Sequence, residues 1–186
     1  MPRTIFPFDE INAFKAELPQ YFANGRIKSE DALDEILDML LDLFLLAYAN
    51  GIAAVNEQFG TDIHPTTQET QETIYKRIDG ATWEDRVRTW YAEGGTEGDI
   101  VRIAETEAHR DGNTAAYETA VKAGAKSKVW KTMMDDRVRD THYPLEGVSV
   151  PIDADFYTWD GDHAPAPGLF SLPENNINCR CELVFK

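Results

Sequence analysis

A chain of 186 residues, of which 42% are apolar, is long enough to fold around one core of ordinary size. Its formal net charge of −15 argues against nucleic acid and anionic membranes as generic partners, because both repel an acidic protein, and it favours a basic protein surface. The two cysteines are one residue apart, which excludes the disulfide framework of a small secreted protein.

The sequence predicts neither a signal peptide nor a membrane span. Residues 1–10 lack the apolar stretch of a signal peptide. The longest apolar run, from Met39 to Ala54, is interrupted by Asp42 and Asn50 and is too short and too polar to cross a bilayer. We therefore expect synthesis in a reducing, cytoplasmic compartment and no membrane partner.

The first part of the chain has the pattern of helices. Residues 8–18 suit a short helix that Pro19 ends. Ser29 is a suitable N-cap for a long helix over residues 30–59, and Gly60 is a suitable C-cap. The apolar residues of this helix cover more than one face, which predicts burial on several sides or a contact between two copies of the chain. They recur at steps of three and four: Leu33, Ile36, Leu37, Leu40, Phe44 and Tyr48.

Asp34, Asp38 and Asp42 share one face of the long helix. We interpret them as a solvated acidic face, and the alternative is a metal site or a contact to a basic partner. Repulsion at this spacing costs about 0.2–0.5 kcal/mol per pair, which a helix tolerates without any partner.

Three more helices are predicted before residue 125. Thr66 or Thr67 caps a helix that runs to about Ile78, and a capping box at residues 82–85 opens a helix that runs to residue 92. The third spans residues 97–123 and ends at Gly124. It carries His109, which we interpret as a structural histidine rather than a ligand or catalytic group.

After residue 124 the helical periodicity stops. Residues 128–134 and 148–151 have the composition of strands, and Pro151 confines the second to an edge or an end. Residues 153–176 predict one long ordered loop, and residues 178–186 a strand with one buried side. The sequence thus predicts an α+β chain: a helical body at residues 1–124, and a compact unit of short strands and a Pro/Gly loop at 125–186, packed on the last helix.

Cys179 and Cys181 point to the same side of the last predicted strand. Two interpretations remain open. Both thiols can be small apolar residues of the core, or they can be two of four ligands of a structural zinc ion. For the zinc site, His142 is the best third ligand, and Asp135 or His163 supplies the fourth.

The turn before the second strand collects charges. Asp135, Arg137 and Arg139 precede His142, and we interpret them as ion pairs that make the turn rigid. A hydrolytic or phosphodiester-binding site is the alternative. We predict no catalytic residue, and no glycine-rich nucleotide-binding pattern is present in the sequence.

The order of these residues resembles the C-terminal signature of Mu F-like phage minor head proteins, also called head morphogenesis proteins. The similar stretch covers residues 98–186, with Glu146 where that family usually has aspartate. The residues that carry the resemblance are Trp130, Thr132, Asp135, Arg137, Arg139, His142, Leu145, Gly147 and Pro151, followed by Asn178, Cys179, Arg180 and Cys181.

The resemblance implies a phage or prophage protein that acts in capsid morphogenesis, DNA packaging or ejection. It implies the portal or the capsid interior as the place of binding, with portal and capsid proteins as partners and nucleic acid contacted only indirectly. It implies a location in the host cytoplasm during assembly and then in the virion head. It does not by itself imply an enzyme.

Two other functions are compatible with the residues. One is a metal-dependent hydrolase or nuclease that uses the Asp135–His142 and Cys179–Cys181 cluster. The other is a host interaction protein unrelated to virions. A contact between two copies through the helix at 30–59 is compatible with each of the three.

Overall fold

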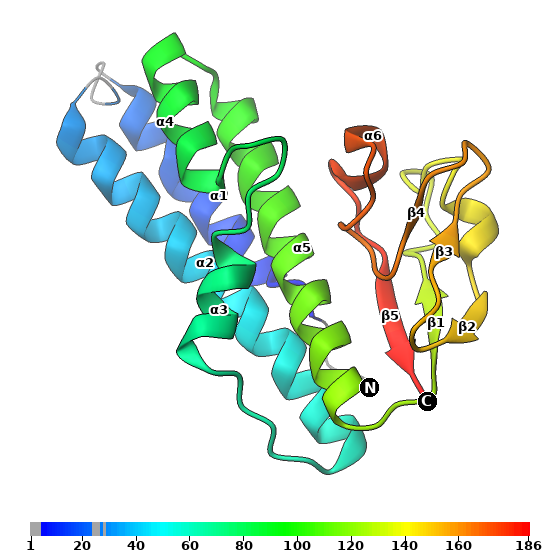
Figure 1. The fold of residues 1–186 in the computed structure, drawn as a ribbon. Helices are drawn as coiled ribbons and strands as arrows, with labels where there is room; N and C mark the ends of the chain where they lie inside the picture. The colour runs from blue at the N-terminus through cyan, green and yellow to red at the C-terminus, as the bar shows by residue number, and fades with distance from the viewer. Residues whose placement is uncertain (1–4, 24–26, 28) are drawn as a thin grey trace.

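The computed structural model describes residues 5–23, 27 and 29–186, and it has helices on one side and short strands on the other (Figure 1). The α+β class is therefore confirmed. The helices are α1 (Phe8–Phe22), α2 (Glu30–Phe59), α3 (Thr67–Ile74), α4 (Trp83–Glu93), α5 (Glu97–Lys122) and α6 (Pro173–Asn176). The strands are β1 (Ser127–Lys131), β2 (Ser149–Pro151), β3 (Phe156–Tyr157), β4 (His163–Ala164) and β5 (Glu182–Phe185), with a 3₁₀ turn, η2, at Tyr143–Leu145.

Side-chain caps fix where the long helices begin. Ser29 accepts a hydrogen bond from the Ala32 N–H at the start of α2, and Gly60 ends this helix in the left-handed conformation. Capping boxes begin α3 at Thr66, α4 at Thr82 and α5 at Thr96. The predicted starts of α2 and α4 are confirmed, because capping depends on neighbouring residues that the sequence displays directly.

Two helix ends differ from the prediction. Pro19 lies inside α1, which continues to Phe22, because Leu18 and Tyr21 extend its buried side and packing outweighs the backbone hydrogen bond that proline cannot make. Helix α3 ends at Ile74 rather than at Ile78, since Ile78 pairs with Ala81 in a tight turn in which Asp79 has a φ of 52°.

Helices α2 and α5 lie side by side through the middle of the helical side of the molecule (Figure 1). Two glycines allow their close approach. A Cβ atom on Gly51 would lie 2.2 Å from the backbone oxygen of Gly112, and one on Gly112 would lie 3.2 Å from the backbone oxygen of Ala47. Gly112, which lowers the intrinsic helix propensity of α5, is therefore needed where the two backbones meet.

We expect Gly51→Ala to destabilise the fold by about 1–3 kcal/mol, because the added methyl group meets backbone that cannot rotate away. The matched control is Gly98→Ala near the start of α5, where the nearest atom to an added Cβ is 3.7 Å away. That control should leave the free energy of unfolding unchanged or raise it by up to about 1 kcal/mol. Urea unfolding of both variants measures the difference, and equal stability of the two would contradict the close-packing argument.

Helix α2 is the central helix of the core. It contacts α1, α3, α4 and α5, so it is buried on more than one side, and Asp34, Asp38 and Asp42 remain exposed on its outer face. By length and composition alone α2 could cross a membrane. The apolar run at residues 39–54 was expected to be too short and too polar for this, but the whole helix is 30 residues long. In the structure, 44% of its most apolar window is buried within the chain.

The C-terminal strands form two small antiparallel sheets. The larger has the order β2-β1-β5, with Trp130 opposite Leu183, and β2 with Pro151 lies at an edge as predicted. Strand β5 begins at Glu182, later than predicted, because β1 ends at Lys131, the partner of Glu182. Asn178, in the segment before the strand, adopts a φ of 57°. Burial nevertheless alternates through Cys179, Cys181, Leu183 and Phe185. The predicted loop at 153–176 contains the β3–β4 hairpin and α6.

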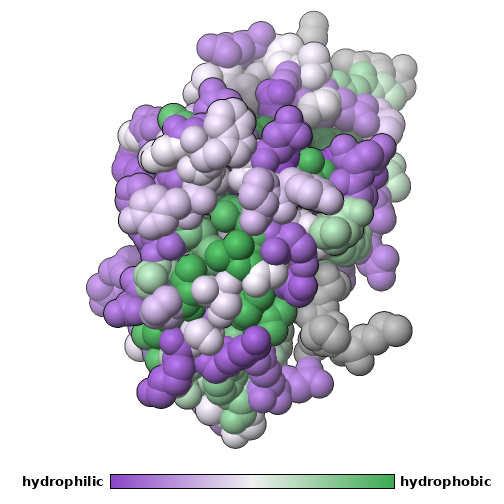
Figure 2. Space-filling model, turned by 90° about the vertical axis from the view of Figure 1, so that its right-hand side faces the viewer, coloured by the Kyte–Doolittle hydropathy of each residue, from purple (hydrophilic) through white to green (hydrophobic). Residues whose placement is uncertain are grey.

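The sheet packs on α5 through a second apolar core. Trp130, which is fully buried, and Leu183 from the sheet join Ala116 and Ala120 from α5 and Val55 from α2. Figure 2 shows the side of the molecule on which the strands lie: hydrophobic side chains gather in the middle of this face and hydrophilic ones surround them. The large apolar residues that stay exposed in this part of the chain are Met134, Tyr143, Val148, Tyr157, Trp159, Leu172, Ile177 and Val184.

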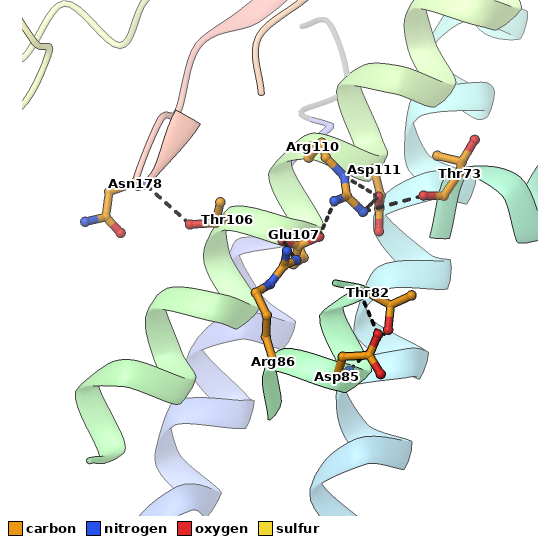
Figure 3. Close-up of polar contacts among 9 residues, drawn as sticks. All are labelled: Thr73, Thr82, Asp85, Arg86, Thr106, Glu107, Arg110, Asp111 and Asn178. Atoms are coloured by element: carbon orange, nitrogen blue, oxygen red, sulfur yellow. Dashed lines mark hydrogen bonds and ion pairs between the residues drawn. The ribbon is translucent and has the colours of Figure 1, made fainter. Parts of the chain in front are cut away.

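A buried cluster of charges on α5 lies where the other helices meet it (Figure 3). Arg110 pairs with Glu107 at 2.5 Å and with Asp111 at 2.8 Å, and Arg86 of α4 reaches the same Glu107. Burial raises the pKa of Asp111 to about 7, although Arg110 opposes this shift. Gly168, with a φ of 85°, rests directly on the backbone of Arg110, so the cluster also supports the C-terminal loop.

Candidate metal centre

Three buried side chains that could bind a metal meet between the sheet and α5. The Nδ1 atom of His142 lies 3.6 Å from the Sγ atom of Cys179 and 3.6 Å from the Sγ atom of Cys181. The exposed fractions of these residues are 1%, 4% and 4%. His142 directly precedes the 3₁₀ turn η2, and the cysteines precede β5, so two separate segments deliver the three side chains.

Aromatic rings and backbone bonds hold His142 in place. The indole ring of Trp130 meets the imidazole edge to face at 5.3 Å, and the ring of Phe170 stacks on it at 5.3 Å. The backbone N–H of His142 donates to the carbonyl oxygen of Arg139 at 2.9 Å. A histidine fixed in this way has little freedom to turn its Nδ1 atom away from the two sulfur atoms.

Helix α5 holds the cysteine segment. His109 Nε2 lies 2.6 Å from the carbonyl oxygen of Cys181, and the side-chain amide of Asn113 donates to the same oxygen at 3.2 Å. His109 and Asn113 are four residues apart, so they share one face of the helix. The sequence indicates only a structural role for His109 and does not indicate Asn113, because their shared partner lies more than sixty residues away in the chain.

The two buried thiols shift each other's pKa in opposite directions. Burial alone would raise the pKa of Cys179, but its hydrogen bond with Cys181 and the influence of His109 and His142 lower that pKa well below its usual range. The same bond, together with burial, raises the pKa of Cys181. Cys179 is therefore the sulfur whose lowered pKa favours the thiolate, which is the form that binds metal.

The distances fit a tetrahedral zinc ion. With Zn–S near 2.3 Å and Zn–N near 2.0–2.1 Å, two ligands of a tetrahedron are about 3.6 Å apart, which matches both His142–cysteine separations. A cavity of about 10 Å³, close to the size of one water molecule, adjoins the three side chains. Two sulfurs and one imidazole nitrogen are also the ligand types that zinc prefers.

The two candidates for a fourth ligand are engaged elsewhere. Asp135 binds Arg180 at 2.6 Å, which together with the Arg137 backbone N–H lowers the pKa of its carboxyl group. His163 pairs with Asp155 at 2.7 Å. Among the residues that the structure describes, the grouped potential ligands are His142, Cys179 and Cys181.

The charged turn has other partners than those expected. Asp135 pairs with Arg180, and the guanidinium group of Arg139 donates to the carbonyl oxygens of Asn175 and Ile177. Arg137 contributes its backbone N–H to the turn, while its side chain is exposed. The turn is therefore tied to the chain around α6 and the cysteines rather than closed upon itself.

Comparisons with known proteins place this sequence in one family. The family model described as "Phage Mu protein F like protein" matches residues 66–184. The match begins at Thr66, the N-cap of α3, and therefore starts before residue 98, where the resemblance noted in the sequence begins. The chain is 34% identical over 85 residues to the minor head protein GP7 of Bacillus phage SPP1, a match that covers 44% of this chain and 28% of that protein.

A second relative, with 35% identity over 88 residues, is named NAD(+)--arginine ADP-ribosyltransferase EFV and comes from Enterococcus faecalis. That match covers 45% of this chain and 18% of the enzyme, so the chain is similar to only a part of each of these two relatives. No solved structure matched. The family match spans well over half of the chain and includes the histidine and both cysteines, and the chain therefore belongs to the phage Mu F-like family of minor head proteins.

Proposed function

We propose that this chain acts in capsid morphogenesis, DNA packaging or ejection, bound to the portal or to the interior of the capsid. The observation that carries the proposal is the family match over residues 66–184, and the SPP1 relative, itself called a minor head protein, supports it. The protein would assemble in the host cytoplasm and remain in the virion head.

The surface supports a role in protein contacts. The side chains of Tyr157 and Trp159 are 67% and 72% exposed, and rings of this kind supply much of the binding energy where two proteins meet. The acidic outer face of α2 offers a second surface that suits a basic partner, or a second copy of the chain through the apolar residues beside it. We propose portal and capsid proteins as the partners, with DNA contacted only indirectly.

Mass spectrometry of purified heads tests the head role. We expect the chain in DNA-filled heads at a small fraction of the abundance of the major capsid protein. Trp159→Ala removes an exposed side chain that belongs to neither core. It should lower the incorporation of the chain into heads several-fold while leaving the melting temperature unchanged. Val121→Ala, an exposed apolar residue on the helical side, is the matched control. Absence of the chain from heads of the wild-type phage would overturn the head role.

We further propose a structural zinc ion bound by His142, Cys179 and Cys181. The equal 3.6 Å separations and the burial of all three residues support this proposal. The ion would tie the turn at residues 135–142 to the segment before β5. One observation favours the alternative of a metal-dependent hydrolase or nuclease: three grouped ligands leave a fourth coordination position, which in catalytic zinc sites holds water.

A further inference from the structure

Beside the metal centre, a cleft of about 650 Å³ opens between α1, α5 and the charged turn. It shares Arg137, Arg139, Asn178, Cys179 and Arg180 with the small cavity at the three ligands, so the centre forms part of its wall. A volume of this size is typical of a ligand-binding pocket. The cleft was not anticipated from the sequence, because α1 and the turn lie more than a hundred residues apart.

The cleft is positively charged in a strongly acidic protein. Lys15, Arg137, Arg139 and Arg180 line it against one acidic residue, Glu105, although the whole chain has a net charge of −15. Lys15 pairs with Glu105, and Arg180 pairs with Asp135. In the described part of the chain, Arg137 and Arg139 form no ion pair despite the excess of carboxylates. Two guanidinium groups therefore remain available for an anionic ligand.

Arg139 is held in position before any ligand arrives. Arg139 is fixed by the carbonyl oxygens of Asn175 and Ile177, and these two bonds leave further N–H donors of its five uncommitted. Asn178, which also lines the cleft, donates its backbone N–H to the Thr106 hydroxyl group of α5 at 3.4 Å (Figure 3). A positioned guanidinium group binds a carboxylate through two parallel hydrogen bonds at a reduced entropic cost.

The side of the cleft formed by α1 and the segment before it is largely apolar, with Asn12 and Lys15 as its polar members. Phe6, Phe8 and Ile11 line it, and Phe8 remains 40% exposed although its ring packs edge to face on Phe6 at 4.6 Å. A ligand that fits both walls carries carboxylates on one side and an apolar or aromatic side chain on the other.

From this geometry we infer that the cleft binds an acidic peptide segment with an apolar anchor residue, presented by another protein. A long polyanion such as nucleic acid fits less well, because the surrounding surface is acidic and would repel its continuing charges. If the proposed head function is correct, the segment belongs to a neighbouring head protein. The assignment of that partner rests on the proposed function, whereas the chemistry of the cleft does not.

Fluorescence anisotropy with a defined probe tests the cleft. The probe is a fluorescein-labelled ten-residue peptide of Asp and Glu around one central Phe, and it is compared with the same peptide carrying Asn and Gln. We expect the acidic peptide to bind and the neutral one to bind at least about tenfold more weakly. Binding of the acidic peptide should weaken as the salt concentration rises.

Arg137→Glu should weaken binding of the acidic peptide at least about fivefold, since it reverses a charge that forms no ion pair. The matched control is Lys126→Glu, which makes the same change of charge at an exposed residue outside the cleft. Phe8→Ala should weaken binding of the probe with Phe more than that of a probe with Ala in its place. Absence of binding at millimolar peptide, or equal effects of Arg137→Glu and Lys126→Glu, would overturn the inference.

A single-stranded oligonucleotide of ten nucleotides that binds more tightly than the acidic peptide would replace a peptide ligand with a nucleic acid and overturn the inference.

Two outcomes separate this inference from the head function. A chain that enters phage heads but binds no acidic peptide retains the head function and loses the cleft. A chain that binds the acidic peptide but is absent from heads retains the cleft and loses the head function.

Discussion

Cys179→Ser is expected to release one zinc ion per chain and to lower the melting temperature by about 10 °C, the largest effect of any substitution proposed here. Serine is a poor zinc ligand because its hydroxyl group stays protonated at neutral pH. The loss corresponds to about 3–5 kcal/mol, less than the roughly 10–16 kcal/mol of zinc-finger peptides, because an apolar core around Trp130 persists without metal. Elemental analysis and thermal unfolding of the purified protein measure the two quantities.

Chelation separates the metal from the packing of the thiol. In the presence of a chelator, wild-type protein and Cys179→Ser should unfold at similar temperatures, because both then lack the ion. Asp135→Asn and His163→Ala are the controls, since Arg180 and Asp155 already engage these side chains. Loss of zinc in either control would identify that residue as the fourth ligand. A wild-type chain without zinc whose unfolding no chelator changes would rule out the structural ion.

The same protein preparations distinguish a structural zinc ion from a catalytic one. A hydrolase or nuclease would cleave peptide or nucleic acid substrates only with zinc bound, and His142→Ala would abolish this cleavage. A structural ion predicts no cleavage at any zinc concentration. The outcome therefore separates a structural ion from a catalytic one.

The second large effect is expected at Asp162, whose buried carboxylate organises the loop between β4 and α6. Its Oδ1 atom accepts hydrogen bonds from the Ser171 hydroxyl group at 2.7 Å and from the backbone N–H of His163 at 2.9 Å. Its Oδ2 atom accepts from the Leu172 N–H at 2.9 Å and from the Asn175 amide at 3.1 Å. We expect Asp162→Asn to destabilise the protein by about 2–4 kcal/mol. The NH₂ group of asparagine donates hydrogen bonds and cannot accept them, and it would lie against groups that also donate.

The pKa of Asp162 gives this prediction a pH dependence. Burial would raise that pKa, but the hydrogen bonds of Ser171, Leu172 and Asn175 lower it to about 2. Because the folded-state pKa is depressed below the unfolded value of about 3.9, the carboxylate contributes about 2.5 kcal/mol at pH values well above 4. This contribution is lost as the pH falls through 2. Urea unfolding should therefore show a wild-type decline between pH 4 and 2 that is smaller in Asp162→Asn and unchanged in exposed Asp140→Asn.

The sequence predicted well those features that depend on near neighbours. The N-cap at Ser29 and the capping box at Thr82 require residues within three positions, and both are confirmed. Pro19 misled the prediction because its local cost is overruled by the burial of Leu18 and Tyr21 against other helices. The role of Asp162 was not predicted, because its partners lie nine to thirteen residues further along the chain and no periodic spacing indicates them.

The candidate site shows the same division. The alternation around Cys179 and Cys181 indicated that both sulfurs face one side, and in the structure His142 lies against both. The zinc ion itself stays a prediction. The contacts of His109 and Asn113 with the carbonyl oxygen of Cys181 could not be predicted, because the residues on one face of a helix do not indicate which distant carbonyl group will lie against it. Nor could the cleft, whose two walls come from opposite ends of the chain.

The pairing of β1 with β5 has a consequence for the order of folding. Lys131 lies opposite Glu182, so this part of the sheet forms only after the intervening loop has closed, and contacts over such separations slow folding. His142 and the cysteines, which are 37 and 39 residues apart, bridge most of the same interval. An ion held between them would restrict the unfolded chain as a cross-link does, and it would lower the entropic cost of closing the sheet. The timing of metal uptake would then set how fast the C-terminal strands reach their final register.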